Sequence, residues 1–495
     1  MPDQPFVGRE TEIDILRSLW ESHDAKFMIL YGRRRVGKTR LITHFLESTD
    51  PAPRAIYWVA EPTSSVAQLQ SFSQAILAFE TGVPQANMDV NFSYGNWRLA
   101  FEAVASLAKE KRLLLVLDEF TYLMAVSRGI AGTLQNAWDH QLKRSNIFLI
   151  ISGSHLGMME REALMPRGPL YGRATSKLKL EPLPFKDTSD YFPNYQTDER
   201  VAVYATFGGI PHYWEQFNPN KKLNQNIREV LLSRENLFFD EPQLLLHDFV
   251  SEIGNYASIL RAIAHGYRTP TEISSITSLA SPNISMYLKN LIDTRFVERR
   301  VPITLSETSR FGRHYITDPF LRFYYRFLAG RQSELARGIT ELALAEFKKH
   351  LIDFIGTHTW EELCREWLQR SVGHKVLPFV PDKVGSEWNR SVQIDVAGIN
   401  WMEKTLILGE CKWGRKQIDQ DVLEKLIEGA NHVVPSKGSW RVYFVSFARD
   451  GWTPQAQKFA SNIKNGQVGG ANWQAEGMLL RTLEQVDKEL RDWTE

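Results

Sequence analysis

Apolar runs alternate with amphipathic stretches along the first third of the chain. Short apolar runs bounded by polar residues predict strands at residues 27–30, 55–59, 113–117 and 147–151. The longer stretches between them carry apolar residues at helical spacing. Strands that alternate with helices are typical of a parallel sheet with helices on both faces. The pattern therefore predicts an α/β domain over residues 1–182.

The rest of the chain divides into three predicted domains. Residues 183–246 form helices interrupted by Gly208-Gly209-Ile210-Pro211, and residues 247–332 form a compact helical block with a hairpin-like end. Residues 333–495 begin with a strongly helical stretch and continue into strand-like runs, which predicts a second α/β domain. These runs are residues 391–397, 405–411 and 441–447.

One segment has the pattern of a phosphate-binding loop, G-x-x-x-x-G-K-[ST]. It is Gly32-Arg33-Arg34-Arg35-Val36-Gly37-Lys38-Thr39, and it lies between the first predicted strand and an amphipathic stretch. Gly32 and Gly37 let the backbone turn tightly, so that successive N–H groups face a polyphosphate. Lys38 can reach the β- and γ-phosphates, and the Thr39 hydroxyl can ligate Mg²⁺. The loop therefore predicts a site for ATP and Mg²⁺.

Two acids follow the buried run at residues 113–117. Asp118 and Glu119 are expected at the carboxyl edge of the sheet, where ligands bind. Asp118 would hold Mg²⁺ mainly through its water shell, and Glu119 would accept a proton from the attacking water. The alternative is a pair of acids that cap a helix. The strand at residues 147–151 ends in Ser152-Gly153-Ser154, and one of these two hydroxyls could orient the same water. The alternative is an ordinary turn at the end of the strand.

One arginine downstream of these motifs could complete the site. Arg173, in Leu170-Tyr171-Gly172-Arg173, could bring positive charge to the γ-phosphate. It could act in cis, or in trans from another copy of the chain in a homo-oligomer. The alternative is an ordinary surface arginine.

Residues 247–332 contain a helix-turn-helix pattern followed by a wing. Thr269-Pro270 and Ser281-Pro282 each combine a capping residue with a first-turn proline, which predicts two helix starts. Residues 295–301 predict a strand, and residues 315–318 its return partner. In a winged helix the second helix can enter a DNA groove. The expected DNA contacts are Ser285 and Lys289 in the groove and Arg295, Arg299 and Arg300 on phosphates. Alternatively, the module packs against the nucleotide domain as a regulatory lid.

Charged residues mark a second candidate site in the last third. Asp395 lies in one predicted strand, and Glu410 and Lys412 share a face of the next. The short connection at residues 398–404 would pair these strands as a hairpin and bring Asp395 beside Glu410. Two such carboxylates can hold Mg²⁺ or Mn²⁺, which activates water, while Lys412 positions the water or neutralises a scissile phosphate. Glu361, in a helix upstream, can complete the site.

The order of the N-terminal motifs resembles that of the archaeal-type ATPase family, on the AAA+/STAND-like side of the P-loop NTPases. The matching segments are Phe6-Val7-Gly8-Arg9-Glu10, the phosphate-binding loop, Leu117-Asp118-Glu119-Phe120, Ser152-Gly153-Ser154 and Gly208-Gly209-Ile210-Pro211. The resemblance extends from residue 6 to about residue 330 and includes the position of the winged helix. It implies that the segment Val7-Gly8-Arg9 packs by the adenine, and that Pro211, in a helical lid over residues 183–246, approaches the adenine base.

The order of helix Glu, strand Asp and strand Glu-x-Lys resembles the PD-(D/E)xK nuclease superfamily. The resemblance implies a restriction-endonuclease-like α/β domain of the kind appended to many archaeal-type ATPases. Trp388 and the segment Gly409-Glu410-Cys411-Lys412-Trp413 fit that pattern. Gln393 departs from the pattern, because an acid often stands at this position before the Ile-Asp pair. The departure argues against a second metal ion and leaves the other site residues intact. Such domains can keep these residues and act only in binding.

Composition limits where such a protein can act. Lys and Arg number 59 against 58 Asp and Glu, so a nucleic-acid surface must be a local patch. Two cysteines, Cys364 and Cys411, supply neither a disulfide framework nor a zinc set. The N-terminus does not resemble a signal peptide, and no apolar run approaches the roughly 18 residues that span a bilayer. We therefore expect a cytoplasmic protein with no membrane partner.

Two functional hypotheses follow from these motifs. In the first, the protein binds and hydrolyses ATP in association with DNA. Its nucleotide state controls a winged helix and a metal-dependent nuclease-like domain, which could cleave DNA. In the second, the protein is a STAND-like ATP switch that signals through protein contacts, and the nuclease fold is a non-cleaving interaction module.

Overall fold

The structure is a computed structural model of the chain. It describes residues 5–84, 91–218, 220–232, 237–247, 252–463 and 468–493. The chain divides into two compact units, which are described separately. Unit 1 comprises Met1–Leu183 and Gly209–Glu215, and unit 2 comprises Pro184–Gly208 and Gln216–Glu495. Three of the predicted domains, from residue 183 onwards, thus lie almost entirely in unit 2.

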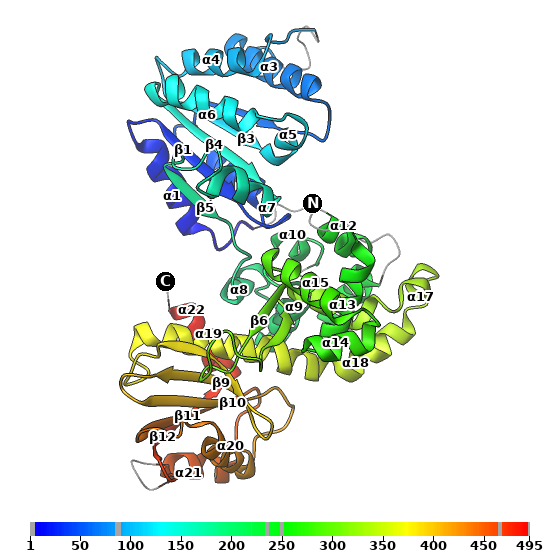
Figure 1. Ribbon diagram of the computed structural model, residues 1–495, viewed down its shortest axis with the longest axis vertical. Coiled ribbons are helices and arrows are strands. Elements are labelled where there is room, and N and C mark those ends of the chain that lie inside the picture. Colours follow the sequence, from blue (N-terminus) through cyan, green and yellow to red (C-terminus); the bar gives the residue numbers. More distant parts are fainter. Residues whose placement is uncertain are drawn as a thin grey trace. The chain divides into compact units, whose positions relative to one another are not determined.

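A five-stranded sheet with strand order β2-β3-β4-β1-β5 forms the centre of unit 1 (Figure 1). All its strand pairs are parallel, which confirms the predicted α/β class. The strands are β1 (Lys26–Tyr31), β2 (Ala55–Val59), β3 (Leu113–Asp118), β4 (Ile147–Gly153) and β5 (Ser176–Lys179). The sequence did not predict β5, because this short edge strand is largely polar and only half-buried.

Alternate residues of the central strands face opposite sides of this sheet. Leu115 and Leu149 belong to a core with Phe72 of α3 and Phe101 of α4, whereas Leu114 and its alternating neighbours are buried on the other face. The helices of unit 1 are α1 (Glu10–Glu21), α2 (Lys38–Ser48), α3 (Ser65–Thr81), α4 (Trp97–Leu107), α5 (Phe120–Val126), α6 (Ile130–His140), α7 (Leu156–Met159) and α10 (Pro211–Trp214). The sheet is therefore covered on both faces, as the repeating strand and helix pattern predicts.

The first half of unit 2 is helical and ends in a two-stranded hairpin. The helices are α8 (Thr188–Tyr191), α9 (Thr197–Phe207), α11 (Leu223–Leu231), α12 (Glu241–His247), α13 (Ile253–Ala264), α14 (Pro270–Thr277) and α15 (Ser281–Asp293). Strands β6 (Val297–Arg300) and β7 (Arg313–Ile316) pair antiparallel. We call β6, β7 and residues 301–312 between them the β6–β7 hairpin. The strand expected at residues 295–301 starts later, because Arg295 has a φ of 61°, which is incompatible with a strand.

A second five-stranded sheet, with strand order β12-β11-β10-β9-β8, forms the C-terminal part of unit 2. Its strands are β8 (Lys383–Trp388), β9 (Gln393–Asn400), β10 (Thr405–Lys412), β11 (Trp440–Ala448) and β12 (Trp473–Thr482). The predicted antiparallel pairing of β9 with β10 is confirmed, and its register pairs Val396 with Gly409. Strands β10, β11 and β12 pair in parallel. The sequence did not predict the two edge strands, β8 and β12.

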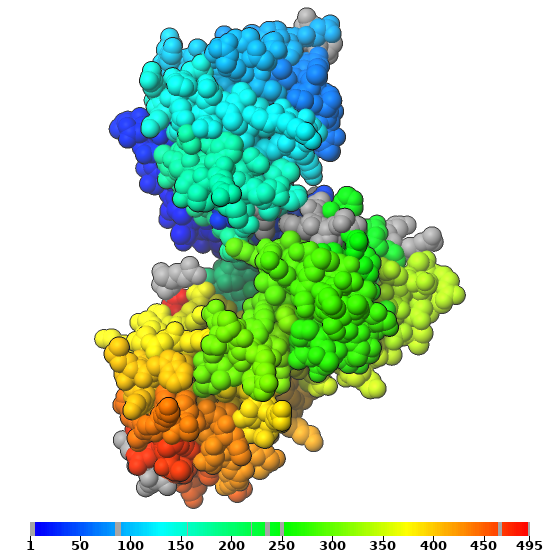
Figure 2. All heavy atoms as spheres, in the orientation of Figure 1, coloured from blue at the N-terminus to red at the C-terminus, as the bar shows by residue number. Residues whose placement is uncertain are grey.

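Helices cover both faces of this second sheet. They are α19 (Glu361–Ser371), α20 (Gln420–Val433), α21 (Pro454–Asn462) and α22 (Leu483–Asp492). Helices α16 (Pro319–Phe323), α17 (Gln332–Ala336) and α18 (Glu341–Phe354) precede them in the chain. Helix α19 packs on one face and α20 on the other (Figure 1). Within unit 2 the atoms of residues 252–332 and those of the C-terminal part meet in one continuous surface (Figure 2). In the described part of the chain, no helix has both the length and the apolar character to cross a bilayer.

Candidate functional site

The phosphate-binding loop connects β1 to α2, and its backbone requires glycine at two positions. Gly37, which precedes α2, has a φ of 99°, where L residues are strained. A Cβ atom on Gly32 would lie 2.5 Å from the carbonyl oxygen of Leu180. Between these glycines, Arg33, Arg34 and Arg35 follow the loop and Val36 is fully buried. The loop thus brings backbone N–H groups to the start of an 11-residue helix, where anions are favoured.

Lys38 and Glu119 meet through a serine hydroxyl. Lys38 Nζ donates to Ser154 Oγ at 2.7 Å and to the carbonyl oxygens of Gly32 and Arg33 at 3.2 and 3.3 Å. Ser154 Oγ in turn donates to Glu119 Oε1 at 2.6 Å. Burial lowers the pKa of Lys38, while Glu119 and Asp118 oppose this shift. The predicted phosphate ligand and the predicted general base therefore face the same point at the carboxyl edge of the sheet.

Asp118 is buried at the end of β3 and accepts three side-chain hydrogen bonds. Thr39 Oγ1 donates to its Oδ2 at 2.8 Å, and the Tyr57 hydroxyl donates to the same oxygen at 2.5 Å. Ser152 Oγ donates to its Oδ1. Burial and the nearby Asp118 carboxylate raise the pKa of Tyr57, which stays a donor. The structure thus brings the two predicted Mg²⁺ residues, Thr39 and Asp118, together beside Ser152.

Four further residues contribute to this site, and the sequence prediction gave no role to two of them, Tyr57 and Tyr213. Tyr57 and Ser154 make the contacts described above. Arg9 is buried and donates to the carbonyl oxygens of Val36 at 3.3 Å and Glu181 at 2.7 Å, so it fixes the loop. Tyr213 accepts a hydrogen bond from Arg33 Nη2 at 2.9 Å. The sequence predicted that the hydroxyl of Ser152 or Ser154 orients the water, and the structure has both at this strand end, with Ser154 bonded to Glu119.

The two residues expected near the adenine base, Gly8 and Pro211, lie beside the phosphate-binding loop or beside Arg9, which holds that loop. Gly8 has a φ of 65° and precedes Arg9, whose side chain holds the loop. Pro211 starts α10, and its ring lies 3.9 Å from the position that a Cβ on Gly37 would occupy. Their contacts with adenine remain a prediction.

Arg173 lies at the wrong edge of the sheet for a contact with phosphate in cis. It precedes the parallel strand β5, so it lies near the start of β1, and the phosphate-binding loop follows the other end of that strand. The six residues of β1 span roughly 16 Å. The Arg173 guanidinium hydrogen-bonds Asp139 at 3.1 Å. The expectation of a cis contact is therefore wrong, and a role in trans stays a prediction.

The structure brings the four predicted C-terminal residues together in unit 2. Glu361 starts α19, Asp395 lies in β9, and Glu410 and Lys412 end β10 and form an ion pair. Burial and the proximity of Asp395 raise the pKa of Glu361 to about 8 and that of Glu410 to about 7. Burial also raises the pKa of Asp395, whose Oδ2 accepts a hydrogen bond from the Cys411 amide at 3.1 Å. We call Glu361, Asp395 and Glu410 the acid cluster.

Arg365 is a further residue of this region that the sequence prediction missed. Its Nη1 donates to Glu361 Oε2 at 3.3 Å, to Ser386 Oγ at 3.1 Å and to the Asp395 carbonyl at 2.9 Å. It therefore connects α19 with β8 and β9. Among the described residues, no group of three or more His, Cys, Asp or Glu side chains is already arranged to hold a metal ion. Mg²⁺ commonly uses one or two protein carboxylates and keeps several waters, so the oxygen donors Asp395 and Glu410 fit it chemically.

Only part of the expected DNA-contacting set faces solvent. Ser285, Lys289 and Arg295 are exposed, on α15 or directly after it. Arg299 Nη1 instead donates to the Glu307 carbonyl at 2.5 Å. Arg300 is half-buried and donates to Glu298 Oε1 at 2.6 Å and, on α19, to Glu362 Oε1 at 3.0 Å. Arg299 is nevertheless exposed, whereas the Arg300 guanidinium is engaged by carboxylates. Contacts of Arg295, Arg299 and Arg300 with DNA phosphates stay a prediction.

A parallel sheet, a G-x-x-x-x-G-K-[ST] loop and an acid pair at the same sheet edge define a P-loop nucleotide-binding protein. Residues 6–217 match the family of ATPase domains found predominantly in Archaea, and residues 324–423 match archaeal and bacterial proteins of unknown function. The uncharacterized protein MJECL04 of Methanocaldococcus jannaschii is 31% identical over 419 residues, which are 84% of this chain and 89% of that protein. The chain belongs to this archaeal ATPase family, and its membership supports ATP binding and ATPase activity.

Two solved structures are also similar. The Walker-type ATPase PABY2304 of Pyrococcus abyssi is 20% identical, and the match covers 65% of this chain and 96% of that chain with a TM-score of 0.48. The ORC2 protein of Aeropyrum pernix, solved in ADPNP and ADP complexes, is 14% identical, with 70% and 96% covered and a TM-score of 0.43.

Proposed function

We propose that the protein hydrolyses ATP at the carboxyl edge of the unit 1 sheet, with Glu119 as the general base. One observation supports this most strongly: Ser154 Oγ lies within hydrogen-bond distance of both Lys38 Nζ and Glu119 Oε1. Lys38 can therefore bind the phosphate that reacts, while Glu119 accepts the proton of the water that attacks the same phosphate.

The residues divide this work between binding and chemistry. The loop N–H groups and Lys38 bind the phosphates, and Thr39 and Asp118 are the pair that would hold Mg²⁺. When bound, Mg²⁺ would offset the phosphate charge. Glu119 takes the proton of the attacking water, and Ser154 orients the Glu119 carboxylate. Ser152 and Tyr57 keep Asp118 in place.

A comparison of two variants tests this assignment. Lys38→Ala should lose nucleotide affinity, whereas Glu119→Gln should keep affinity and lose turnover, because only the base acts solely in the transition state. Glu47→Gln, an exposed acid on α2, is the matched control and should behave as wild type. Wild-type turnover by Glu119→Gln would show that Glu119 is not the base.

We further propose that α14, α15 and the β6–β7 hairpin form a winged helix-turn-helix that binds DNA. The order of elements supports this, as does the exposed face of α15 with Ser285 and Lys289. Replacement of Lys289 and Arg295 together by Ala should weaken DNA binding and reduce the slope of log K against log salt by about one, for the lost phosphate contact of Arg295. A slope unchanged from wild type, or no salt-dependent DNA binding, would favour the STAND-like protein switch.

For the C-terminal part of unit 2 we propose a Mg²⁺- or Mn²⁺-dependent nuclease site at the acid cluster. Asp395 and Glu410 supply hard oxygen donors at neighbouring positions of paired strands, and Lys412 supplies positive charge beside them. Asp395→Ala should abolish both Mn²⁺ binding and cleavage of plasmid, linear or branched DNA. Lys412→Ala should keep Mn²⁺ binding and lose cleavage. Cleavage that persists in Asp395→Ala would exclude this site.

The covalent path of the chain supports control by nucleotide. Helix α10, which flanks the phosphate-binding loop through Pro211, continues directly from α9 of unit 2 through Gly208-Gly209. ATP should therefore change DNA affinity or cleavage relative to ADP in wild type, and this difference should disappear in Lys38→Ala.

A further inference from the structure

The β6–β7 hairpin contacts helix α19, which carries Glu361, and strand β8, the neighbour of the strand that carries Asp395. Its stem, strand β6, contacts α19, which begins with Glu361. The segment between its strands, residues 301–312, contacts β8, and β8 pairs with β9, which carries Asp395. These contacts all lie within unit 2.

The stem contact is an ion-pair network around Glu362. Arg300 Nη2 lies 3.0 Å from Glu362 Oε1, and Arg322 donates to both carboxylate oxygens at 3.0 and 3.1 Å. Glu361 precedes Glu362 directly, and successive residues of an α-helix point about 100° apart. Fixing the Glu362 side chain to the hairpin therefore fixes the rotation of the helix turn that carries Glu361. A π-helical segment, η7 (Ile355–Trp360), comes immediately before this turn.

The second contact joins the segment 301–312 to strand β8. The Ile303 amide donates to the Ser386 carbonyl at 3.2 Å, and the Ile303 side chain is buried in the core of the second sheet. The Thr304 amide donates to Glu387 Oε2 at 3.0 Å. Ser386 Oγ donates to the Asp395 carbonyl at 2.7 Å. The hairpin is thus two hydrogen bonds away from the backbone of an acid in the cluster.

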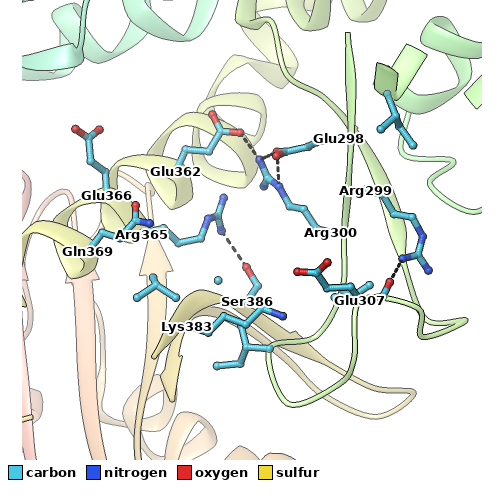
Figure 3. A pocket seen from close by; sticks show the side chains of 15 residues that line it. Glu298, Arg299, Arg300, Glu307, Glu362, Arg365, Glu366, Gln369, Lys383 and Ser386 are labelled. Atoms are coloured by element: carbon cyan, nitrogen blue, oxygen red, sulfur yellow. Dashed lines mark hydrogen bonds and ion pairs between the residues drawn. The ribbon is translucent and has the colours of Figure 1, made fainter. Parts of the chain in front are cut away.

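Between these two contacts the hairpin stands away from α19 and β8. A polar pocket of about 650 Å³ separates them, and its rims carry Arg300 with Glu362 and Arg365 with Ser386 (Figure 3). The lining side chains include four acids and four bases, so the pocket has no net charge that would select a ligand. The hairpin is held by Arg300, by the buried Ile303 and by the Phe311 carbonyl, which accepts from Trp388 Nε1 at 3.2 Å. Around the open polar pocket it lacks the close packing of a core, so this part of the hairpin can separate locally.

We propose that docking of the β6–β7 hairpin assembles the acid cluster, so that the hairpin regulates divalent-cation affinity at this site. This inference rests on the proposed function of the cluster as a Mg²⁺ or Mn²⁺ site. In the docked state Arg300 holds the first turn of α19 and Ile303 holds β8, which brings Glu361 and Asp395 into one site. Separation of the hairpin from α19 and β8 weakens cation binding.

The test is Mn²⁺ titration of the full-length protein, followed by electron paramagnetic resonance, with hydrogen exchange of residues 355–365 as a second readout. Arg300→Ala should weaken Mn²⁺ affinity roughly tenfold, the low end of the loss seen when supporting partners of ligands are removed. It should also speed exchange in residues 355–365. Arg300→Lys should restore part of both effects. Arg310→Ala is the matched control, because Arg310 is an exposed arginine of the same hairpin whose described contact is with the adjacent Phe311 ring.

The outcomes separate the inference from the function on which it rests. Wild-type Mn²⁺ affinity and wild-type exchange in Arg300→Ala would overturn the inference and leave the metal site standing. An equal loss of Mn²⁺ affinity in Arg310→Ala would also overturn the inference, because the loss would then come from removing any positive charge from the hairpin. If wild type binds no Mn²⁺, the proposed metal site fails. Unchanged exchange in Arg300→Ala would then refute the docking role independently.

Discussion

Removal of the Ser154 hydroxyl should slow ATP hydrolysis without a comparable loss of nucleotide affinity. In Ser154→Ala, Glu119 loses its 2.6 Å hydrogen bond and keeps the Ser154 amide at 3.3 Å. Lys38 loses one contact at 2.7 Å and keeps two loop carbonyls. The carboxylate is therefore affected more than the ammonium group.

The expected fall in kcat can be worked out because the lost hydrogen bond is made to a charged group, the Glu119 carboxylate. A hydrogen bond to a charged group contributes about 1.5–3 kcal/mol, and each 1.36 kcal/mol in the barrier changes the rate about tenfold. If Ser154 orients Glu119 for proton transfer, kcat should fall roughly 10- to 150-fold. Affinity for a fluorescent ATP analogue should change much less, because the loop N–H groups and Lys38 still bind the phosphates.

Steady-state ATPase assays with saturating Mg²⁺ and titrations of the same preparations would measure both quantities. Ser154→Thr is the matched variant, since it keeps a hydroxyl at the same position, and it should retain most of the wild-type kcat. Wild-type kcat in Ser154→Ala would refute the orienting role. A defect of equal size in Ser154→Thr would mean that packing, and not the hydroxyl, is responsible.

Three further predictions address the binding loop, unit 2 and the acid cluster. Gly32→Ala should abolish nucleotide binding in titrations, because its Cβ would lie 2.5 Å from the Leu180 carbonyl oxygen; binding by a folded variant would contradict the loop geometry. Asp487→Ala should lower the free energy of unfolding of unit 2 by about 3 kcal/mol in urea, because it leaves the buried Arg200 without its carboxylate. A loss below about 1 kcal/mol would show that the pair behaves as an exposed one. Asp395→Asn should remove Mn²⁺ binding in calorimetry and leave ATPase turnover unchanged, and a parallel loss of turnover would contradict independent sites.

Local patterns were sufficient to predict four of the five strands and the binding loop of unit 1. The apolar runs of β1, β3 and β4 are each an unbroken series of buried residues. Such a run can be recognised as a strand without knowledge of its tertiary contacts. Strand β5 has the sequence Ser-Lys-Leu-Lys and no such pattern. Its omission caused the error at Arg173, because an arginine directly before a parallel strand lies at the amino edge of the sheet, away from the phosphates.

The partners of individual charges could not be predicted, since they are set by tertiary contacts. Arg299 and Arg300 stand in a basic stretch that looks like a phosphate-binding surface, yet the acid that holds Arg300 on α19 is 62 residues further along the chain. Asp395 and Glu410 were predictable as neighbours because a short connection determines the hairpin register. Arg365, which joins Glu361 to the Asp395 backbone, has no distinguishing sequence signal among the charged residues of α19.

Long-range ion pairs also join the predicted domains of unit 2 to one another. Arg200 of α9 pairs with Asp487 of α22 at 2.6 Å, with both side chains buried, and Asp198 of α9 pairs with Arg449 at 2.6 Å. These pairs join the helical region after residue 183 to the C-terminal sheet. A chain cut at the predicted boundary after residue 332 would leave Arg200 with only threonine hydroxyls as hydrogen-bond partners among its described contacts. The DNA, nuclease and hairpin tests therefore require the full chain, because separated fragments would lose the contacts that define unit 2.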